Sequence, residues 1–204
     1  MKKIIVIAIL IIFSNSLFAK NFSFGVEGGA GINTAIIEFS DGTKSDFDFI
    51  PTVRFGGGAE YSFNEITTLQ IKTFFHHRNG FSFTNSNGKT NVSFMTIDIP
   101  VLLKFTFTGI ENINGRFSIF TGPNFSFKIS DFDVSIGGWK NDLNIFSSDD
   151  IFAAGIECGA EYAFTKEDGF RLCCSVLYDI SDFSHNADFS TRRLCIMPYL
   201  SYWF

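Results

Sequence analysis

The chain is poor in the residue types that most often carry chemistry, with three histidines and four cysteines among its 204 residues. No Cys-x-x-Cys pair occurs, so the spacing typical of a zinc site is missing. His76 and His77 are consecutive, and consecutive residues of a strand point to opposite faces. Their two rings therefore cannot share one metal ion without a bulge. We expect neither a metal site nor a cofactor.

Long apolar runs are equally scarce, and the one that occurs lies at the start of the chain. Two lysines precede the apolar stretch Ile4–Phe13, and a short stretch of polar and small residues then ends at Ala19. This order is typical of a secretory signal peptide. We expect residues 1–19 to be removed during export and residues 20–204 to form a single domain without a membrane-spanning helix.

The cysteines are too few and too awkwardly placed for a disulfide framework. Export would bring them to an oxidising compartment, where disulfides are permitted. Cys173 and Cys174 point to opposite faces of one segment, and Cys158 lies only diagonally from Cys174, at the limit of about 7 Å between Cα atoms. We expect these three and Cys195 to be free thiols.

Phenylalanine and glycine are abundant instead, with 28 Phe, 18 Gly and 46% hydrophobic residues overall. The apolar residues follow no helical period but recur at every second position, which is typical of strands with one apolar face. Eight segments show this alternation: 22–33, 53–63, 69–76, 95–107, 116–128, 152–164, 170–180 and 193–204. We expect each to cross a bilayer as a tilted strand, which takes roughly 9–11 residues.

The connections between these segments alternate in length. Long ones span residues 38–49, 78–91, 130–150 and 181–191, and short ones span residues 64–66, 109–115 and 166–169. Membrane barrels have short turns on the periplasmic side and long loops outside. The sequence therefore predicts an all-β fold, an eight-stranded antiparallel up-and-down transmembrane β-barrel.

Charged residues of the eight segments lie on the face opposite the Phe-rich one. They are Glu27, Arg54, Glu60, Lys72, Asp98, Lys104, Arg116, Lys128, Glu157, Glu161, Arg171, Asp179 and Arg193. These six acids and seven bases predict a mixed network of ion pairs in the lumen.

A soluble eight-stranded barrel of the lipocalin kind also alternates, but it turns its apolar face inward. An eight-stranded interior holds only side chains or one small ligand. The Phe-rich face is too bulky for such an interior, whereas a membrane barrel can direct it into hydrocarbon. The alternation therefore favours the membrane barrel.

The last predicted strand indicates which kind of membrane barrel the chain forms. Counting back from the end, every second residue is apolar or proline: Phe204, Tyr202, Leu200, Pro198, Ile196 and Leu194. This pattern resembles the closing strand of bacterial outer-membrane β-barrel proteins. The resemblance implies that the barrel-assembly machinery reads this strand, with Tyr202 and Phe204 as the signal. It also implies the outer membrane of a diderm bacterium, and outer-membrane lipid as a partner.

Three internal segments indicate a narrower group of barrel proteins. The segments Ile97–Lys104, Phe120–Asn124 and Gly155–Tyr162 read IDIPVLLK, FTGPN and GIECGAEY. They resemble strands of the outer-membrane β-barrel domain families, PorT-like proteins among them, which share their shape with OmpA- and OmpX-like small barrels. The resemblance implies location more than activity, because such barrels host adhesins, structural proteins, enzymes and transporters.

Enzymatic patterns of these barrels are missing. Outer-membrane lipid deacylases place His and Ser two residues apart on a strand, which neither His76–Arg78 nor His185–Ala187 does. We expect His76 and His77 at the rim, where their strand leaves the membrane. Acyl-transferring barrels begin with an amphipathic helix, whereas strand character here begins at Phe22. We expect a non-enzymatic barrel, structural or surface-binding in an adhesin-like way. The alternative is a narrow pore or a transport or assembly accessory, and a lipid-modifying enzyme is least favoured.

The long connections carry acids and aromatics together. Asp131, Asp133, Asp142, Asp149 and Asp150 share the third long connection with Phe132, Trp139 and Phe146. The acids are explained by the ordinary solubility of loops in water, or, together with exposed aromatics, they indicate a surface that gathers divalent cations or binds a basic extracellular ligand. The formal net charge of −5 argues against nucleic acid as a partner.

Overall fold

The computed structural model describes residues 21–39, 48–85, 88–107, 115–130, 133–136, 139–141, 152–164, 169–181, 185–186 and 189–204. The expected signal peptide, residues 1–19, lies outside these residues. Within them, no helix is long and apolar enough to cross a membrane.

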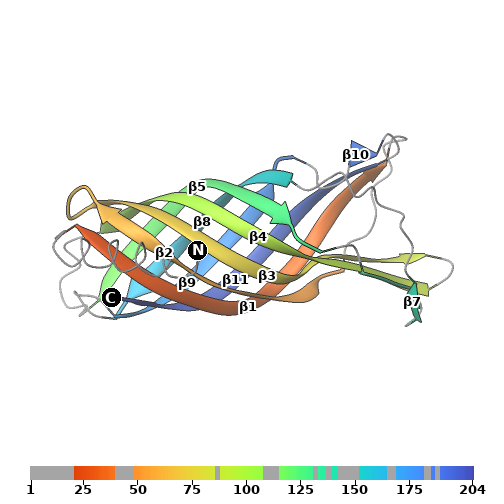
Figure 1. The fold of residues 1–204 in the computed structure, drawn as a ribbon, viewed down its shortest axis with the longest axis horizontal. Coiled ribbons are helices and arrows are strands. Elements are labelled where there is room, and N and C mark those ends of the chain that lie inside the picture. Colours follow the sequence, from red (N-terminus) through yellow and green to blue (C-terminus); the bar gives the residue numbers. More distant parts are fainter. Residues whose placement is uncertain are drawn as a thin grey trace, which may run out of the picture.

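The described residues form eleven strands of one antiparallel sheet, and eight of these strands close into a barrel (Figure 1). The barrel strands are β1 (Phe22–Phe39), β2 (Ile50–Ser62), β3 (Thr67–Asn85), β4 (Gly88–Phe107), β5 (Arg116–Lys128), β8 (Phe152–Ala163), β9 (Phe170–Asp179) and β11 (Phe189–Trp203). Each pairs with the next, and β11 pairs with β1. The predicted eight-stranded antiparallel barrel is confirmed.

The two ends of the barrel wall meet at its short-turn end. The N–H of Phe204 donates to the carbonyl oxygen of Phe24 over 2.8 Å, and the N–H of Ser62 donates to that of Asn21 over 2.8 Å. In the β2–β3 turn, the Asn64 side-chain oxygen accepts from the N–H groups of Ile66 and Thr67 at 2.9 and 2.8 Å. Asparagine is typical of such turns because its side chain replaces a backbone partner.

Several strands run further than the alternation predicted. The segment expected as a loop at residues 78–91 is mostly a hairpin, in which β3 and β4 pair as far as Asn85 and Gly88. A bulge between His76 and Asn79 bends β3 where it leaves the barrel. Strand β1 likewise continues to Phe39, opposite Phe189 of β11.

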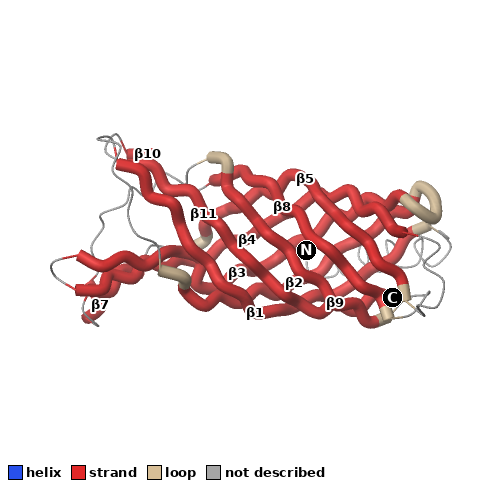
Figure 2. Tube along the Cα trace, turned by 180° about the vertical axis from the view of Figure 1, so that it is seen from behind, coloured by secondary structure: helices blue, strands red, loops and turns tan. Residues whose placement is uncertain are grey.

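The connection expected at residues 130–150 also contains strands. Strand β6 (Asp133–Ile136) pairs with β4, and β7 (Trp139–Asn141) pairs with β6. The two-residue strand β10 (His185–Asn186) pairs with β11. Seen from behind, β7 and β10 both lie at the end of the barrel opposite the short turns (Figure 2).

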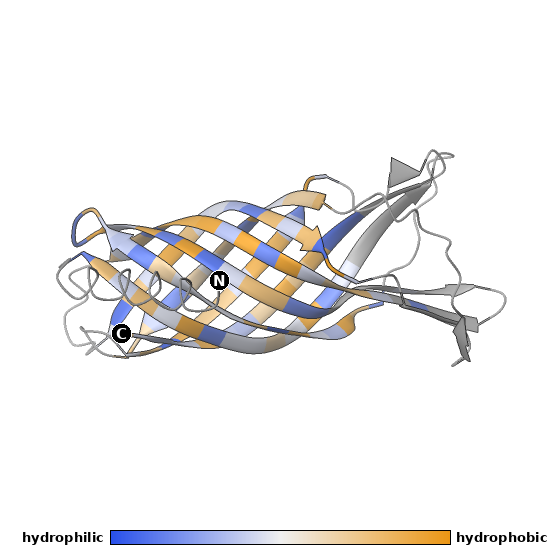
Figure 3. Cartoon of the chain, viewed as in Figure 1, coloured by the Kyte–Doolittle hydropathy of each residue, from blue (hydrophilic) through white to orange (hydrophobic). Residues whose placement is uncertain are grey.

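Apolar and polar residues alternate along the coloured parts of the barrel strands that face the viewer (Figure 3). Large apolar side chains on the outer wall are exposed, among them Phe55, Ile71, Leu103, Ile156 and Leu200. At the short-turn end, outward aromatic rings touch in pairs, such as Phe107 with Phe117 at 5.8 Å between ring centroids. A broad apolar wall with aromatic rings at its margin matches the lipid-facing surface of a membrane barrel.

An arginine on this wall should be costly. Leu103 lies on β4, 43% exposed on the outside. Leu103→Arg should lower the free energy of unfolding in phospholipid vesicles by about 2–4 kcal/mol, because the charge would face hydrocarbon. Leu103→Phe is the control and should cost little. Urea titration would contradict a lipid-facing wall if both variants unfolded at the same midpoint.

Candidate functional site

The lumen is the part of the barrel where charged side chains gather. Eleven of the predicted lumen residues are buried there: Glu27, Arg54, Glu60, Lys72, Asp98, Lys104, Glu157, Glu161, Arg171, Asp179 and Arg193. The remaining two lie nearer to solvent. Arg116 begins β5 and is exposed, and Lys128 ends β5 and is partly exposed. Both have the inward phase of the strand, but at its two ends the lumen opens to water.

Four charges form a closed box near the short-turn end. Oε1 of Glu60 accepts from Nζ of Lys104 at 2.5 Å and from Nη1 of Arg171 at 2.8 Å, and Gln70 also donates to it. Oε1 of Glu161 contacts the same two cations at 3.2 and 3.1 Å. Each cation therefore contacts both acids, which fixes the spacing of four strands.

Two further ion pairs lie in the middle of the barrel. Arg54 donates to Glu157 through both terminal nitrogens, at 3.2 and 2.7 Å, and Lys72 lies 2.9 Å from Glu27. The forked geometry of the first pair is the stronger arrangement. All four side chains are no more than 1% exposed. Each charged group therefore has an ion-pair partner in place of contact with water.

A third cluster lies toward the long-loop end. Arg193 donates to both oxygens of Asp179 at 2.8 and 3.0 Å, and also to Ser126 at 2.7 Å. Its other terminal nitrogen lies 3.6 Å from Asp98, whose Oδ2 is 3.0 Å from Nδ1 of His76. Acidic and basic groups thus follow one another along the whole barrel.

His76 lies deeper than the sequence indicated. We expected a histidine at the rim, but its ring is fully buried beside Asp98. His77 is partly exposed on the opposite face of β3, as the alternation requires. The barrel wall continues past His76 because β3 and β4 run on beyond the bulge, which a rim assignment could not include.

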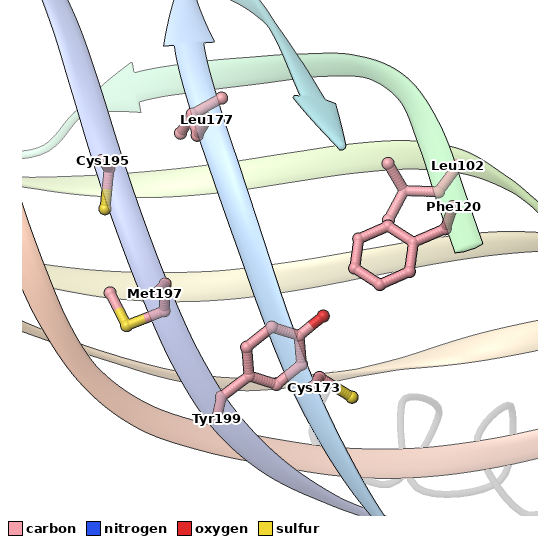
Figure 4. Close-up of a cluster of buried hydrophobic side chains, with 7 residues drawn as sticks. All are labelled: Leu102, Phe120, Cys173, Leu177, Cys195, Met197 and Tyr199. Atoms are coloured by element: carbon pink, nitrogen blue, oxygen red, sulfur yellow. The ribbon is translucent and has the colours of Figure 1, made fainter. Parts of the chain in front are cut away.

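Apolar side chains fill the space between the ion pairs. A buried cluster is drawn in Figure 4 and comprises Leu102, Phe120, Cys173, Leu177, Cys195, Met197 and Tyr199. Rings also cover the cations: the Arg54 guanidinium lies 3.9 Å from the centroid of Phe74, and that of Arg171 lies 4.8 Å from Trp203. Alternation along the strands puts these rings on the inward phase but predicts no role for them, because cation–π contacts join strands far apart in sequence.

The sulfur atoms divide between the two faces. Cys173 and Cys195 are buried in the lumen, Cys158 and Cys174 are exposed on the outer wall, and all four are free. In the described part of the chain, no group of three His, Cys, Asp or Glu side chains is arranged to hold a metal ion. What the lumen chemistry provides is therefore ion pairing and packing.

The other predicted site residues lie away from the lumen. Tyr202 and Phe204 point outward at the short-turn end, with their rings 4.9 Å apart. Trp139 begins β7, whereas Phe132 and Phe146 lie outside the described residues. The structure therefore places Trp139 and the pair of Tyr202 and Phe204 at opposite ends of the barrel.

The four-charge box predicts a large effect from a single neutral substitution. Glu60→Leu would leave Lys104 and Arg171 with one shared acid in a buried site, which should cost about 3–5 kcal/mol of stability. Glu65→Leu, in the exposed turn that follows β2, removes the same charge without a buried partner and should have little effect. Equal urea midpoints for the two variants in lipid would contradict a buried network.

Comparisons with known proteins agree with this geometry. The family described as outer membrane protein beta-barrel domain matches residues 13–184. Among solved structures, the outer membrane protein OprG of Pseudomonas aeruginosa has a TM-score of 0.53 at 17% identity, over 91% of this chain and 97% of that chain.

Two further solved barrels align over similar lengths. Neisserial surface protein A has a TM-score of 0.45 at 14% identity, covering 90% of this chain and 97% of that chain. Ail, the attachment invasion locus protein of Yersinia pestis, has a TM-score of 0.44 at 13% identity, covering 90% and 99%. No curated protein matches the sequence.

The family match spans most of the chain, and the closed eight-stranded wall, apolar outside and charged inside, is the architecture that such a family requires. The chain belongs to the outer membrane protein beta-barrel domain family and is a barrel of the bacterial outer membrane.

Proposed function

We propose that this protein is a non-enzymatic surface-binding barrel, whose membrane wall anchors sheet extensions that bind an extracellular ligand. The observation that carries the proposal is strand length. Strands β3 and β4 have 19 and 20 residues, whereas a tilted strand crosses the hydrocarbon in roughly 9–11. About eight residues of each, or about 25 Å, are therefore available beyond the lipid.

The extension is a sheet and not a single hairpin. Beyond the barrel, the backbone order is β3, β4, β6 and β7, and β1 pairs with β11 as a second extension on the same end. Paired backbone resists bending better than a free loop, so it can present residues at a fixed distance from the membrane. Trp139 on β7 and the flanking Phe132 and Phe146 are the aromatic residues that we assign to the binding surface.

The described part of the lumen supports the same proposal. Its charges are paired with one another, and His76 is buried against Asp98, away from lipid. A lipid-modifying enzyme would need its base at the lipid face or at an accessible rim. We further propose residues 1–19 as the export signal, and Tyr202 and Phe204 as the contact for the barrel-assembly machinery.

Removing the aromatic extension should weaken binding and leave the barrel intact. Replacement of residues 132–146 by a short Gly-Ser linker should reduce attachment of cells displaying the protein to surfaces coated with collagen, fibronectin or laminin. The control replaces Asn64–Ile66, in a short turn at the opposite end, by Gly-Ser-Gly. Full attachment by the 132–146 variant, with the heat-dependent gel shift of a folded barrel retained, would count against surface binding by this segment.

A narrow pore is the second candidate, because acids and bases follow one another along the entire lumen. Only a rearrangement of buried pairs such as Arg54 with Glu157 would open such a path. We expect the purified protein to show little current in planar bilayers at moderate voltage. Large and stable currents from the unaltered protein would replace the surface-binding proposal with the pore.

A further inference from the structure

The seam where β11 meets β1 has bulky residues on one strand and glycines on the other. On the lumen face, Gly25 pairs with Trp203 and Gly29 pairs with Tyr199. A Cβ atom at Gly25 would overlap the indole of Trp203, and one at Gly29 would overlap Tyr199 and its backbone. The indole of Trp203 therefore occupies space that exists only because β1 has no side chain at Gly25, and Gly29 lets the backbone of β11 approach β1 closely at Tyr199.

The same pattern continues one step along the seam. A Cβ at Gly31 would meet the Ile196 carbonyl oxygen and Met197. Backbone pairing is interrupted between Gly29 and Ile32, opposite Pro198, which has no N–H to donate. Side-chain packing therefore adds to the specificity of the β1–β11 pairing at the point where the backbone hydrogen bonds between these strands are interrupted.

The fit also selects one register. In the observed pairing, Glu27 lies opposite the small residue Ser201. A shift of the seam by two residues would place Glu27 opposite Tyr199 in one direction and opposite Trp203 in the other. Either shift would bring a carboxylate against a ring and separate the rings from their glycines, so both alternatives lose packing.

The rings supplied by β11 lie between cations supplied by other strands. Trp203 lies 4.8 Å from the Arg171 guanidinium and 5.8 Å from Nζ of Lys72. Tyr199 lies 5.6 Å from the same nitrogen and 5.2 Å from the Arg54 guanidinium. Cations from β9, β3 and β2 thus alternate with rings from the last strand along the lumen.

We propose that pairing of β11 with β1 closes the barrel and seals its lumen in one step, with Trp203 and Tyr199 as the permeability barrier. Without β11, Arg171 would lose its contact with Trp203, while Arg54 and Lys72 would keep only the rings of Phe74 and Phe120 beside their carboxylates. Water could then pass between the charges. The two rings, each no more than 3% exposed, occupy that space when the last strand docks. This goes beyond surface binding, since it assigns the barrier to named residues whatever the barrel binds outside.

Sealing of the lumen is tested by removing large side chains from the inward face of β11 in one variant and from its outward face in another. Trp203→Ala combined with Tyr199→Ala should give a folded barrel, with the heat-dependent gel shift retained, that releases potassium from liposomes severalfold faster than the unaltered protein. The control combines Ile196→Ala with Leu200→Ala, two residues of the outward phase on the same strand, and should stay tight. If the lumen pair does not fold, Trp203→Leu alone is measured. A folded lumen variant as tight as the control would overturn the barrier assignment.

Closure is tested on β1. Gly25→Leu should prevent the gel-shifted form from appearing, and a second substitution, Trp203→Ala, should restore it by vacating the space of the indole. Gly28→Leu is the matched control, because a Cβ at Gly28 has only ordinary contacts, the nearest being Phe55 Cβ at 3.8 Å. The proposal fails if Gly25→Leu folds as readily as Gly28→Leu, or if Trp203→Ala gives no rescue. Neither result depends on whether the protein binds an extracellular ligand.

Discussion

Closure of the strand ring is the constraint on which the rest of this structure depends. Hydrocarbon offers no partner for backbone N–H and C=O groups, so a sheet can cross a membrane only when its first and last strands pair. Here that pairing joins β1 to β11. Once the ring is closed, strand alternation leaves one face for lipid and one face for a narrow interior. The Phe-rich and charged phases of the sequence satisfy these two environments separately.

The charged interior follows from the same closure. An eight-stranded ring leaves room for side chains but not for a wide water channel, so each buried charge needs a partner from another strand. The structure meets this need with a four-charge box, two separate ion pairs and the cluster around Arg193. Buried pairs of this kind add little net stability over apolar packing, but losing one member is costly. Their contribution is therefore to specify which strands face one another.

Sequence alone predicted the faces of the strands but not the contacts across the lumen. Alternation is local, so Glu60 and Arg171 could be assigned to the interior from their own segments. Their ion pair joins positions 111 residues apart and depends on strand tilt and register, which local periodicity does not contain. The same limit hid the depth of His76 and the extension of β3 and β4, because residues 84–91 are all polar or glycine and lack the apolar alternation that marks a spanning strand. The inward phase of Trp203 and Tyr199 was visible, but their contact with cations was not.

The orientation of the two faces is the central claim, and lipid quenching measures it most directly. In a background where Trp139 and Trp203 are replaced by Phe, a single tryptophan is placed at Phe120, 2% exposed in the lumen, or at Phe105, 39% exposed on the outer wall. Bromine-labelled acyl chains should quench the fluorescence of the Phe105→Trp protein strongly and that of the Phe120→Trp protein weakly. Equal quenching at both positions, or stronger quenching at position 120, would contradict a barrel with its aromatic face in lipid and its charges enclosed.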